Sequence, residues 1–268
     1  MYVDAHAHLD KYDSELPEIL DEIERNEIFT VSVSMNPESY TRSRKISEQS
    51  QWVVTSFGVH PWDAPEFRNR LESLDPLVDN SPMVGEIGLD YHFVTEPEKH
   101  VIQREVFTYF VRKGVSQQKI LNIHSKGAEA DVDKILGELG VRRAIIHWYS
   151  GPIQELEKLI EKGFYFSIGV EILSNSHIQT ITKTIPAPQL LTETDNPGGY
   201  QWLAGELGRP SIIRSVVKMI SDVRQWEQRE TEHLIIENVM RLASGDSWAA
   251  ELIKRTADGS RPAKDNNI

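Results

Sequence analysis

Short apolar runs alternate along the chain with segments of helical periodicity. The runs are rich in β-branched residues and contain few polar positions, which is typical of strands buried on both faces of a parallel sheet. Eight such runs precede about residue 225, at positions 2–7, 29–34, 52–59, 83–89, 119–123, 143–146, 164–168 and 189–191. The pattern therefore predicts eight strands separated by segments long enough to form helices.

Between these runs, apolar residues recur at intervals of three and four. Examples are Leu16, Ile19, Leu20 and Ile23 in one segment, Val132, Ile135, Leu136 and Leu139 in a second, and Ile153, Leu156, Leu159 and Ile160 in a third. Strand–helix alternation repeated eight times predicts an α/β protein with a (β/α)8 TIM barrel, and a doubly wound open sheet is the structural alternative. Two later apolar stripes, at 212–220 and 234–242, predict extra C-terminal helices.

We expect the barrel domain to occupy residues 1–245. Residues 246–268 hold a possible short helix around 248–254, followed by a polar run that contains Gly259 and Pro262. Polar terminal segments without an apolar stripe are rarely held in place by packing. This stretch is therefore predicted to be a flexible tail.

Composition narrows the function classes. The 268 residues include no cysteine, so disulfides and thiolate ligands are excluded, and any metal must be held by His, Asp or Glu. A net charge of −12 argues against charge-driven coating of nucleic acid. No run of about 18 apolar residues is present, so no membrane span is expected. The start lacks a signal-peptide pattern, and a cytoplasmic location is predicted.

Metal-competent side chains stand at the ends of the predicted strands, where barrel enzymes carry their chemistry. Residues two apart on a strand share a face, so His6 and His8 project together. Each such side chain has an ordinary explanation by itself, as a buried core histidine, a turn residue or a helix N-cap. Their coincidence at one rim favours a metal site instead. The candidate ligands are His6, His8, Glu86, His124, His147 and Asp195.

These residue types suit two divalent cations such as Zn²⁺, Mn²⁺ or Mg²⁺, with Fe²⁺ also compatible. Two ions within about 4 Å need a carboxylate between them, and Glu86 is the candidate bridge. The two first-strand histidines and Asp195 would complete one site, and the histidines of strands five and six the other. Asp195 is also the expected general base, so Asp195 and Glu86 are the predicted catalytic residues.

Six motifs together resemble one known family. They are DAHAHLD at 4–10, GVHPW at 58–62, GEIGLDY at 85–91, IHS at 123–125, HWYSG at 147–151 and ETDNP at 193–197. In order and spacing they are similar to the TatD family of metal-dependent hydrolases, within the amidohydrolase superfamily, over about residues 1–243. The resemblance implies a barrel with one or two divalent metals, the same six ligands, and 3′-to-5′ deoxyribonuclease activity on a short single-stranded DNA end.

Some positions differ from the family pattern, and two histidines near the predicted site are not needed as metal ligands. Lys126 stands where the family commonly has arginine, and it would bind phosphate as a point charge. Trp148 and Tyr149 follow the strand-six histidine, where they either stack on a base or pack beneath the rim. His60 is interpreted as a phosphate or leaving-group contact, or else as a structural hydrogen-bond partner. His92 is a further candidate for substrate contact.

The predicted function is a metal-dependent phosphodiesterase that removes nucleotides from DNA ends by means of a metal-activated water. One alternative is a hydrolase of another ester, a lactone or an amide on the same two-metal site, because such a site polarises C=O as readily as P–O. A second alternative is a metal-binding or scaffold protein without catalysis. A substrate panel distinguishes the hydrolases, while the sequence leaves the oligomeric state and the physiological metal open.

Overall fold

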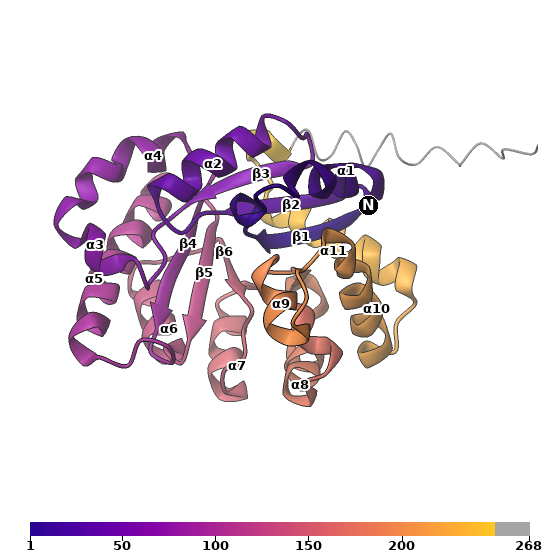
Figure 1. Ribbon diagram of the computed structural model, residues 1–268. Helices are drawn as coiled ribbons and strands as arrows, with labels where there is room; N and C mark the ends of the chain where they lie inside the picture. The colour runs from indigo at the N-terminus through magenta and orange to yellow at the C-terminus, as the bar shows by residue number, and fades with distance from the viewer. Residues whose placement is uncertain (250–268) are drawn as a thin grey trace, which may run out of the picture.

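The computed structural model describes residues 1–249 and contains eight parallel strands arranged in sequence order (Figure 1). Their bounds are β1 Tyr2–Ala7, β2 Ile28–Val33, β3 Val53–Phe57, β4 Met83–Asp90, β5 Leu121–Lys126, β6 Ala144–His147, β7 Tyr165–Ile168 and β8 Leu190–Thr192. Helices separate the strands and lie outside them in Figure 1. The predicted (β/α)8 barrel is confirmed.

Eleven α-helices cover the described strands. Their bounds are α1 Leu16–Asn26, α2 Pro37–Ser47, α3 Ala64–Phe67, α4 Asp75–Asn80, α5 Pro97–Ser116, α6 Glu129–Glu138, α7 Ile153–Glu161, α8 Ser176–Thr184, α9 Gly198–Ala204, α10 Ile213–Arg224 and α11 Gln228–Leu242. Local sequence explains where several begin. In α2, for example, the Asn36 side chain accepts the backbone N–H groups of Glu38 and Ser39 at 3.1 and 3.0 Å, and Pro37 occupies the first turn.

Two strand boundaries differ from the apolar pattern. β5 continues through Lys126, because the backbone of residues 123–126 pairs with residues 87–90 of β4. His124 therefore lies inside the strand rather than after it. β3 ends at Phe57, although the apolar run continues to Val59. Hydrophobicity alone misses the end of β5, because pairing between strands continues through polar residues, and it overestimates β3, because apolar residues also occur where pairing has ended.

β8 closes the barrel onto β1. The Asp195 backbone N–H donates to the His6 carbonyl at 2.9 Å, and the His8 N–H donates to the Asn196 carbonyl at 2.8 Å. Beneath these bonds, the Thr192 hydroxyl donates to the Val3 carbonyl at 2.5 Å. Closure therefore brings the first and last candidate ligands next to each other.

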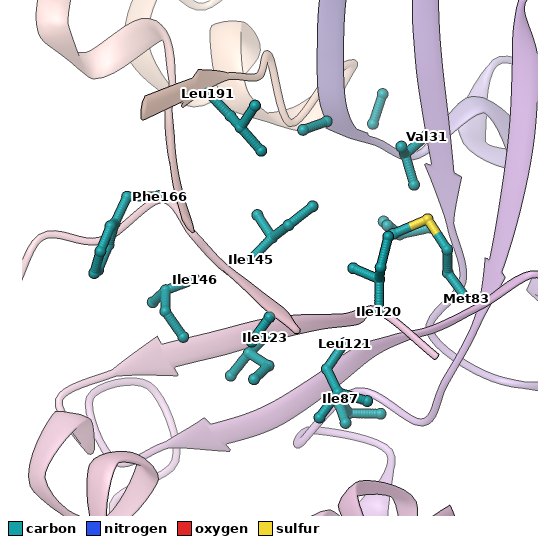
Figure 2. Packing of buried hydrophobic residues seen from close by; sticks show 14 of the residues in the cluster. Val31, Met83, Ile87, Ile120, Leu121, Ile123, Ile145, Ile146, Phe166 and Leu191 are labelled. Atoms are coloured by element: carbon teal, nitrogen blue, oxygen red, sulfur yellow. The ribbon is translucent and has the colours of Figure 1, made fainter. Parts of the chain in front are cut away.

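The core is built from apolar side chains of the strands. Figure 2 shows Val31, Met83, Leu121, Ile145 and Leu191, from five different strands, among packed hydrophobic neighbours. All five are at most 1% exposed. Full burial of side chains of this size stabilises the fold by roughly 1.5–3 kcal/mol each.

The predicted extra C-terminal helices correspond to α10 and α11. In α11 the buried Asn238 donates to the carbonyls of Ala187 and Leu190 at 2.7 and 2.8 Å, which holds this helix against the start of β8. At the start of the predicted tail, Trp248 stacks on Phe29 with ring centroids 5.7 Å apart. The rest of that tail, residues 250–268, lies outside the described residues. Within residues 1–249 no helix is long and apolar enough to span a membrane.

Candidate metal centre

The six predicted ligands converge at the carboxyl ends of the strands. His6 and Glu86 are buried within β1 and β4, while His124 and His147 lie on β5 and β6. Together with His60, which is not one of the six, their ligand atoms fall into groups within 4.8 Å of one another, which is close enough to share an ion. The groups are His6 with Glu86 and His147, His6 with His8 and Asp195, and His60 with Glu86 and His124.

Glu86 stands between two sets of histidines. Its Oε2 lies 3.5 Å from His6 Nε2 and 3.4 Å from His8 Nε2. Its Oε1 lies 3.1 Å from His124 Nδ1 and 3.0 Å from His147 Nε2. The two oxygens of one carboxylate therefore face different donor sets, which is the arrangement that a bridge between two cations requires.

Asp195 faces the first of these sets. Its Oδ1 lies 3.5 Å from His6 Nε2 and 3.3 Å from His8 Nε2. The residue has a φ of +50°, an uncommon backbone conformation for a residue other than glycine. Its backbone is held by the bond to the His6 carbonyl and by the Gly199 N–H, which donates to the Asp195 carbonyl at 2.7 Å. The barrel closure thus fixes Asp195 in this position.

Buried atoms in the cluster lack hydrogen-bond partners. Among the described residues, His6 Nε2 and Glu86 Oε2 are both buried and make no hydrogen bond, although they face each other. Leaving a buried polar group unpaired costs about 1–3 kcal/mol. Imidazole nitrogens and carboxylate oxygens are ligands for divalent transition metals and Mg²⁺. The residues present therefore fit a metal centre.

The cluster shifts the pKa values of its own groups. Burial raises the pKa of Glu86, but His60, His6 and His147 together outweigh it and hold that pKa well below its usual range. For His147, burial lowers the pKa, whereas Glu86 and Glu193 raise it more, so its pKa lies well above the ordinary value. The cluster therefore favours a negative Glu86 carboxylate at its centre and a positive charge on the neighbouring His147 ring.

Three further residues orient the histidines, and the sequence analysis assigned none of them a role. Asn122 Oδ1 lies 2.8 Å from His6 Nδ1, and Asp90 Oδ2 lies 3.2 Å from His124 Nε2. Glu193, which is fully buried, lies 3.6 Å from His147 Nδ1. Partners of this kind fix the ring orientation and tautomer of metal-binding histidines. Two stood within the quoted motifs, Asp90 in GEIGLDY and Glu193 in ETDNP, but only the fold reveals the contacts.

His60 lies in the cluster, within reach of Glu86. Its Nε2 is 3.4 Å from Glu86 Oε1, and its Nδ1 accepts the backbone N–H of Trp62 at 3.3 Å. Burial lowers the pKa of His60 more than Glu86 raises it, which favours the neutral ring. With Nδ1 as acceptor, the single proton of that ring is on Nε2 and faces Glu86. The two interpretations of His60, as a substrate contact and as a structural hydrogen-bond partner, both stay predictions.

Only some of the other predicted substrate contacts line a pocket. Lys126 lines a pocket above the cluster, and its Nζ donates to Ser150 at 2.7 Å. Trp148 lines the same pocket, whereas Tyr149 is buried beneath it, with its hydroxyl bonded to the Pro152 carbonyl. His92 is exposed and is not among the residues that line the pocket.

The pocket opens directly over the cluster and has a volume of about 280 Å³. Its floor includes His8, Glu86 and Asp195, and large aromatic side chains form much of its wall. Three of these aromatic residues lie in loops or in the short helix α9, where no sequence pattern predicts a role for them: Trp62, Phe93 and Trp202. Exposed loop aromatics have no periodicity that would reveal them.

Known proteins share both the sequence pattern and the architecture. A family model described as TatD related DNase matches residues 3–244. A Bacillus subtilis protein named as an uncharacterized metal-dependent hydrolase is 28% identical over 253 residues, which cover 90% of this chain and 98% of the relative. The human protein named Deoxyribonuclease TATDN3 is 26% identical, covering 90% of this chain and 93% of the relative.

Solved structures have the same fold. The Escherichia coli TatD homologue YJJV superposes with a TM-score of 0.81 at 20% identity, covering 90% of this chain and 97% of that one. A TatD family hydrolase from Entamoeba histolytica gives a TM-score of 0.76 at 19% identity, with coverages of 90% and 97%. At these identities the likeness establishes the barrel architecture.

Proposed function

Because the chain belongs to the TatD related DNase family of metal-dependent hydrolases, we propose that it is a 3′-to-5′ deoxyribonuclease that cleaves phosphodiester bonds at single-stranded DNA ends. The observation that carries the proposal is the division of the Glu86 carboxylate between two donor sets, 3.4–3.5 Å from one and 3.0–3.1 Å from the other. Phosphodiester cleavage is a reaction for which paired cations are well suited. The relatives named as deoxyribonucleases support DNA as the substrate.

In this proposal the six ligands would hold two divalent ions, Mg²⁺, Mn²⁺ or Zn²⁺, and Glu86 would contribute one oxygen to each donor set. Such ions supply charge neutralisation at a phosphoryl oxygen and lower the pKa of water. Asp195 accepts the proton from the attacking water. Burial raises the pKa of Asp195. Hydrogen bonding and attraction from His8 and nearby histidines outweigh burial and hold this pKa below its usual value, so the carboxylate is ionised at neutral pH.

Lys126 and the wall of the pocket contribute to substrate positioning. Lys126 carries a positive charge at the pocket edge, where it contacts a phosphate oxygen as a point charge. His60 keeps Glu86 in place from the side of the second donor set. Trp148 offers an aromatic surface next to His147.

A substrate panel with metal-reconstituted protein tests the proposal. Single-stranded DNA labelled at the 5′ end should be shortened one nucleotide at a time from its 3′ end, and closed circular single-stranded DNA should resist. Matched lactone, amide and phosphomonoester substrates are the comparison. Faster turnover of a lactone or an amide than of DNA would contradict the proposal. The Asp195→Asn variant, with its metal content measured, separates loss of turnover from loss of metal.

A further inference from the structure

We propose that two aromatic pairs at the pocket, Trp62 with Phe93 and Trp148 with Trp202, each bind an unpaired base of the DNA end, on opposite sides of the scissile phosphate. This inference rests on the proposed function and specifies its substrate: a single strand whose last two bases are free. The first pair follows β3 and β4, and the second belongs to the loop after β6 and to α9, after β8. Because the strands run in order around the barrel, these positions lie across the rim from each other.

The first pair is attached to the metal cluster through Asp90. Trp62 Nε1 donates to Asp90 Oδ2 at 2.7 Å, and the same oxygen lies 3.2 Å from His124 Nε2. Phe93 meets Trp62 edge to face, with ring centroids 5.8 Å apart and an interplanar angle of 83°. Trp62 and Phe93 are 49% and 58% exposed. The pair is thus held in orientation while its outer surface remains open.

The second pair is attached through the chain itself, because Trp148 directly follows His147. Trp148 Nε1 donates to Glu171 Oε2 at 2.7 Å, and Trp202 meets the Trp148 ring edge to face at 6.1 Å and 77°. A side chain at Gly199 would place its Cβ 2.9 Å from Trp148 Cζ3 and 2.3 Å from the Thr194 carbonyl oxygen. Only glycine at position 199 leaves room for the Trp148 indole beside the pocket.

Charge at the pocket points to the aromatic surfaces as the main source of affinity. Lys11 and Lys126 are the only basic side chains other than histidine among the described residues that line it, and the whole chain has a net charge of −12. A strongly acidic protein with two lysines at its site gains little from a long phosphate track. Base–aromatic stacking, in contrast, binds single strands without requiring net charge and tolerates any base sequence.

Size and geometry limit the occupant further. Trp202 is 67% exposed, so large apolar surface is left open at one site, a feature that marks ligand-binding surfaces. The volume of about 280 Å³ lies near the lower end of small-molecule pockets, roughly 300–1,000 Å³, so the pocket suits the end of a strand and not a long stretch of it. Bases within a duplex are paired and stacked on each other, so their faces cannot lie on the protein.

Phe93→Ala and Trp202→Ala test the two pairs separately. Neither the Phe93 nor the Trp202 side chain makes a hydrogen bond in the described structure. Truncating either side chain should therefore leave the fold and the metal ligands in place. Val101→Ala is the matched control, because Val101 is 44% exposed on α5 and does not line the pocket. The full chain is reconstituted with Mn²⁺ and assayed on oligonucleotides that are intact, abasic at the 3′-terminal nucleotide, or abasic at the penultimate nucleotide.

For wild-type protein, each abasic position should raise KM by roughly 5- to 150-fold, the range that stacking of one base supplies at about 1–3 kcal/mol. Each alanine variant should show a similar rise on intact DNA and lose its sensitivity at one abasic position, with the two variants losing it at different positions. Tryptophan fluorescence quenching by the intact oligonucleotide gives a second readout that does not depend on turnover. Val101→Ala should behave as wild type.

Equal KM values for intact and abasic ends, or unchanged KM in both alanine variants, would overturn the inference. Cleavage of DNA with no dependence on its bases overturns this inference alone and leaves the proposed function intact. Absence of DNA cleavage by wild-type protein, with hydrolysis of another substrate in the panel, overturns the proposed function and the inference with it. Cleavage of blunt duplex as efficient as that of a single strand would also contradict two unpaired bases.

Discussion

The two ends of the barrel differ in whether their polar groups are hydrogen-bonded. At the amino ends of the strands, side chains donate hydrogen bonds to backbone carbonyls of neighbouring segments. Arg143 donates to the carbonyls of Leu242 and Gln118, and Asn238 donates to those of Ala187 and Leu190. At the carboxyl ends, buried atoms of His6, His8, Glu86, His147 and Glu193 make no hydrogen bond among the described residues.

This difference separates stability from function along one axis. The hydrogen bonds of Arg143 and Asn238 at the amino end stabilise the fold. The carboxyl end carries buried carboxylates and imidazoles whose free atoms a metal ion would satisfy, so without a metal this end stabilises the fold less. Barrel proteins in general keep their chemistry at the carboxyl end. Substitutions at the two ends should therefore separate activity from stability, and the following predictions are ordered by expected effect.

Glu86→Gln should produce the largest functional loss at the carboxyl end. It keeps the volume of the side chain but removes the charge shared by both donor sets. Turnover should fall by more than about 1,000-fold, the upper end of the cost of removing one electrostatic group from an active site. Elemental analysis and a nuclease assay on the same sample measure the effect. Full turnover with unchanged metal content would remove the bridge from the assignment.

Arg143→Ala should produce the largest stability loss at the amino end. The guanidinium donates to the carbonyl of Gln118 and to that of Leu242 at the end of α11, and it forms an ion pair with Asp246, so its removal leaves several groups unpaired. The free energy of unfolding should fall by about 2–4 kcal/mol. Urea unfolding measures this, and turnover of the folded protein at low temperature should stay within about twofold of wild type, a difference of less than 0.5 kcal/mol in activation energy. An unfolding free energy equal to that of wild type would show that Arg143 does not stabilise the amino end.

Glu193→Gln tests whether the carboxyl end depends on residues behind the ligands. Glu193 lies 3.6 Å from His147 Nδ1 and accepts a hydrogen bond from Ser167. Metal affinity should weaken by about 10- to 100-fold, as for other partners of metal-binding histidines. Isothermal titration with Mn²⁺ measures it. Glu155→Gln on α7 is the control, since its carboxylate pairs with Lys158 outside the cluster, and equal affinities of the two variants would rule out an orienting role for Glu193.

Glu22 gives the smallest and most pH-dependent effect, away from the metal cluster. Its carboxylate accepts the Ser211 backbone N–H at 2.7 Å and Arg209 Nε at 2.8 Å. Burial raises the pKa of Glu22, but the bonds to Ser211 and Arg209 lower it by more. The pKa of Glu22 in the folded protein therefore lies below the value in the unfolded chain. Its contribution, about 1–2 kcal/mol, is therefore present above pH of about 4.3 and lost as pH falls through the folded pKa.

Denaturant unfolding of wild type and Glu22→Gln at several pH values measures this difference. The gap in unfolding free energy should be full at pH 7 and should shrink in acid, because protonation of Glu22 removes the same charge as the substitution. A gap that is constant from pH 7 to pH 3 would show that the carboxylate charge is not the source of the stabilisation.

The sequence predicted the barrel because its evidence is local: apolar runs mark strands and periodic stripes mark helices. It also placed candidate ligands at strand ends, since strand order alone brings these ends together. It could not predict that Asn122, Asp90 and Glu193 contact particular histidines, because those contacts cross between strands and depend on ring orientation. Phe93 and Trp202 were likewise missed, since they lie in a loop and in a short helix without an apolar stripe.

Barrel closure carries a consequence for the order in which this protein is made. His6 and His8 leave the ribosome long before Asp195, yet Asp195 reaches them only when β8 has docked on β1 through the Asp195–His6 and His8–Asn196 backbone bonds. A nascent chain that stops before β8 therefore exposes two histidines but lacks the carboxylate that completes their group. The group of His6, His8 and Asp195 is therefore complete only in a chain that has been synthesised beyond β8.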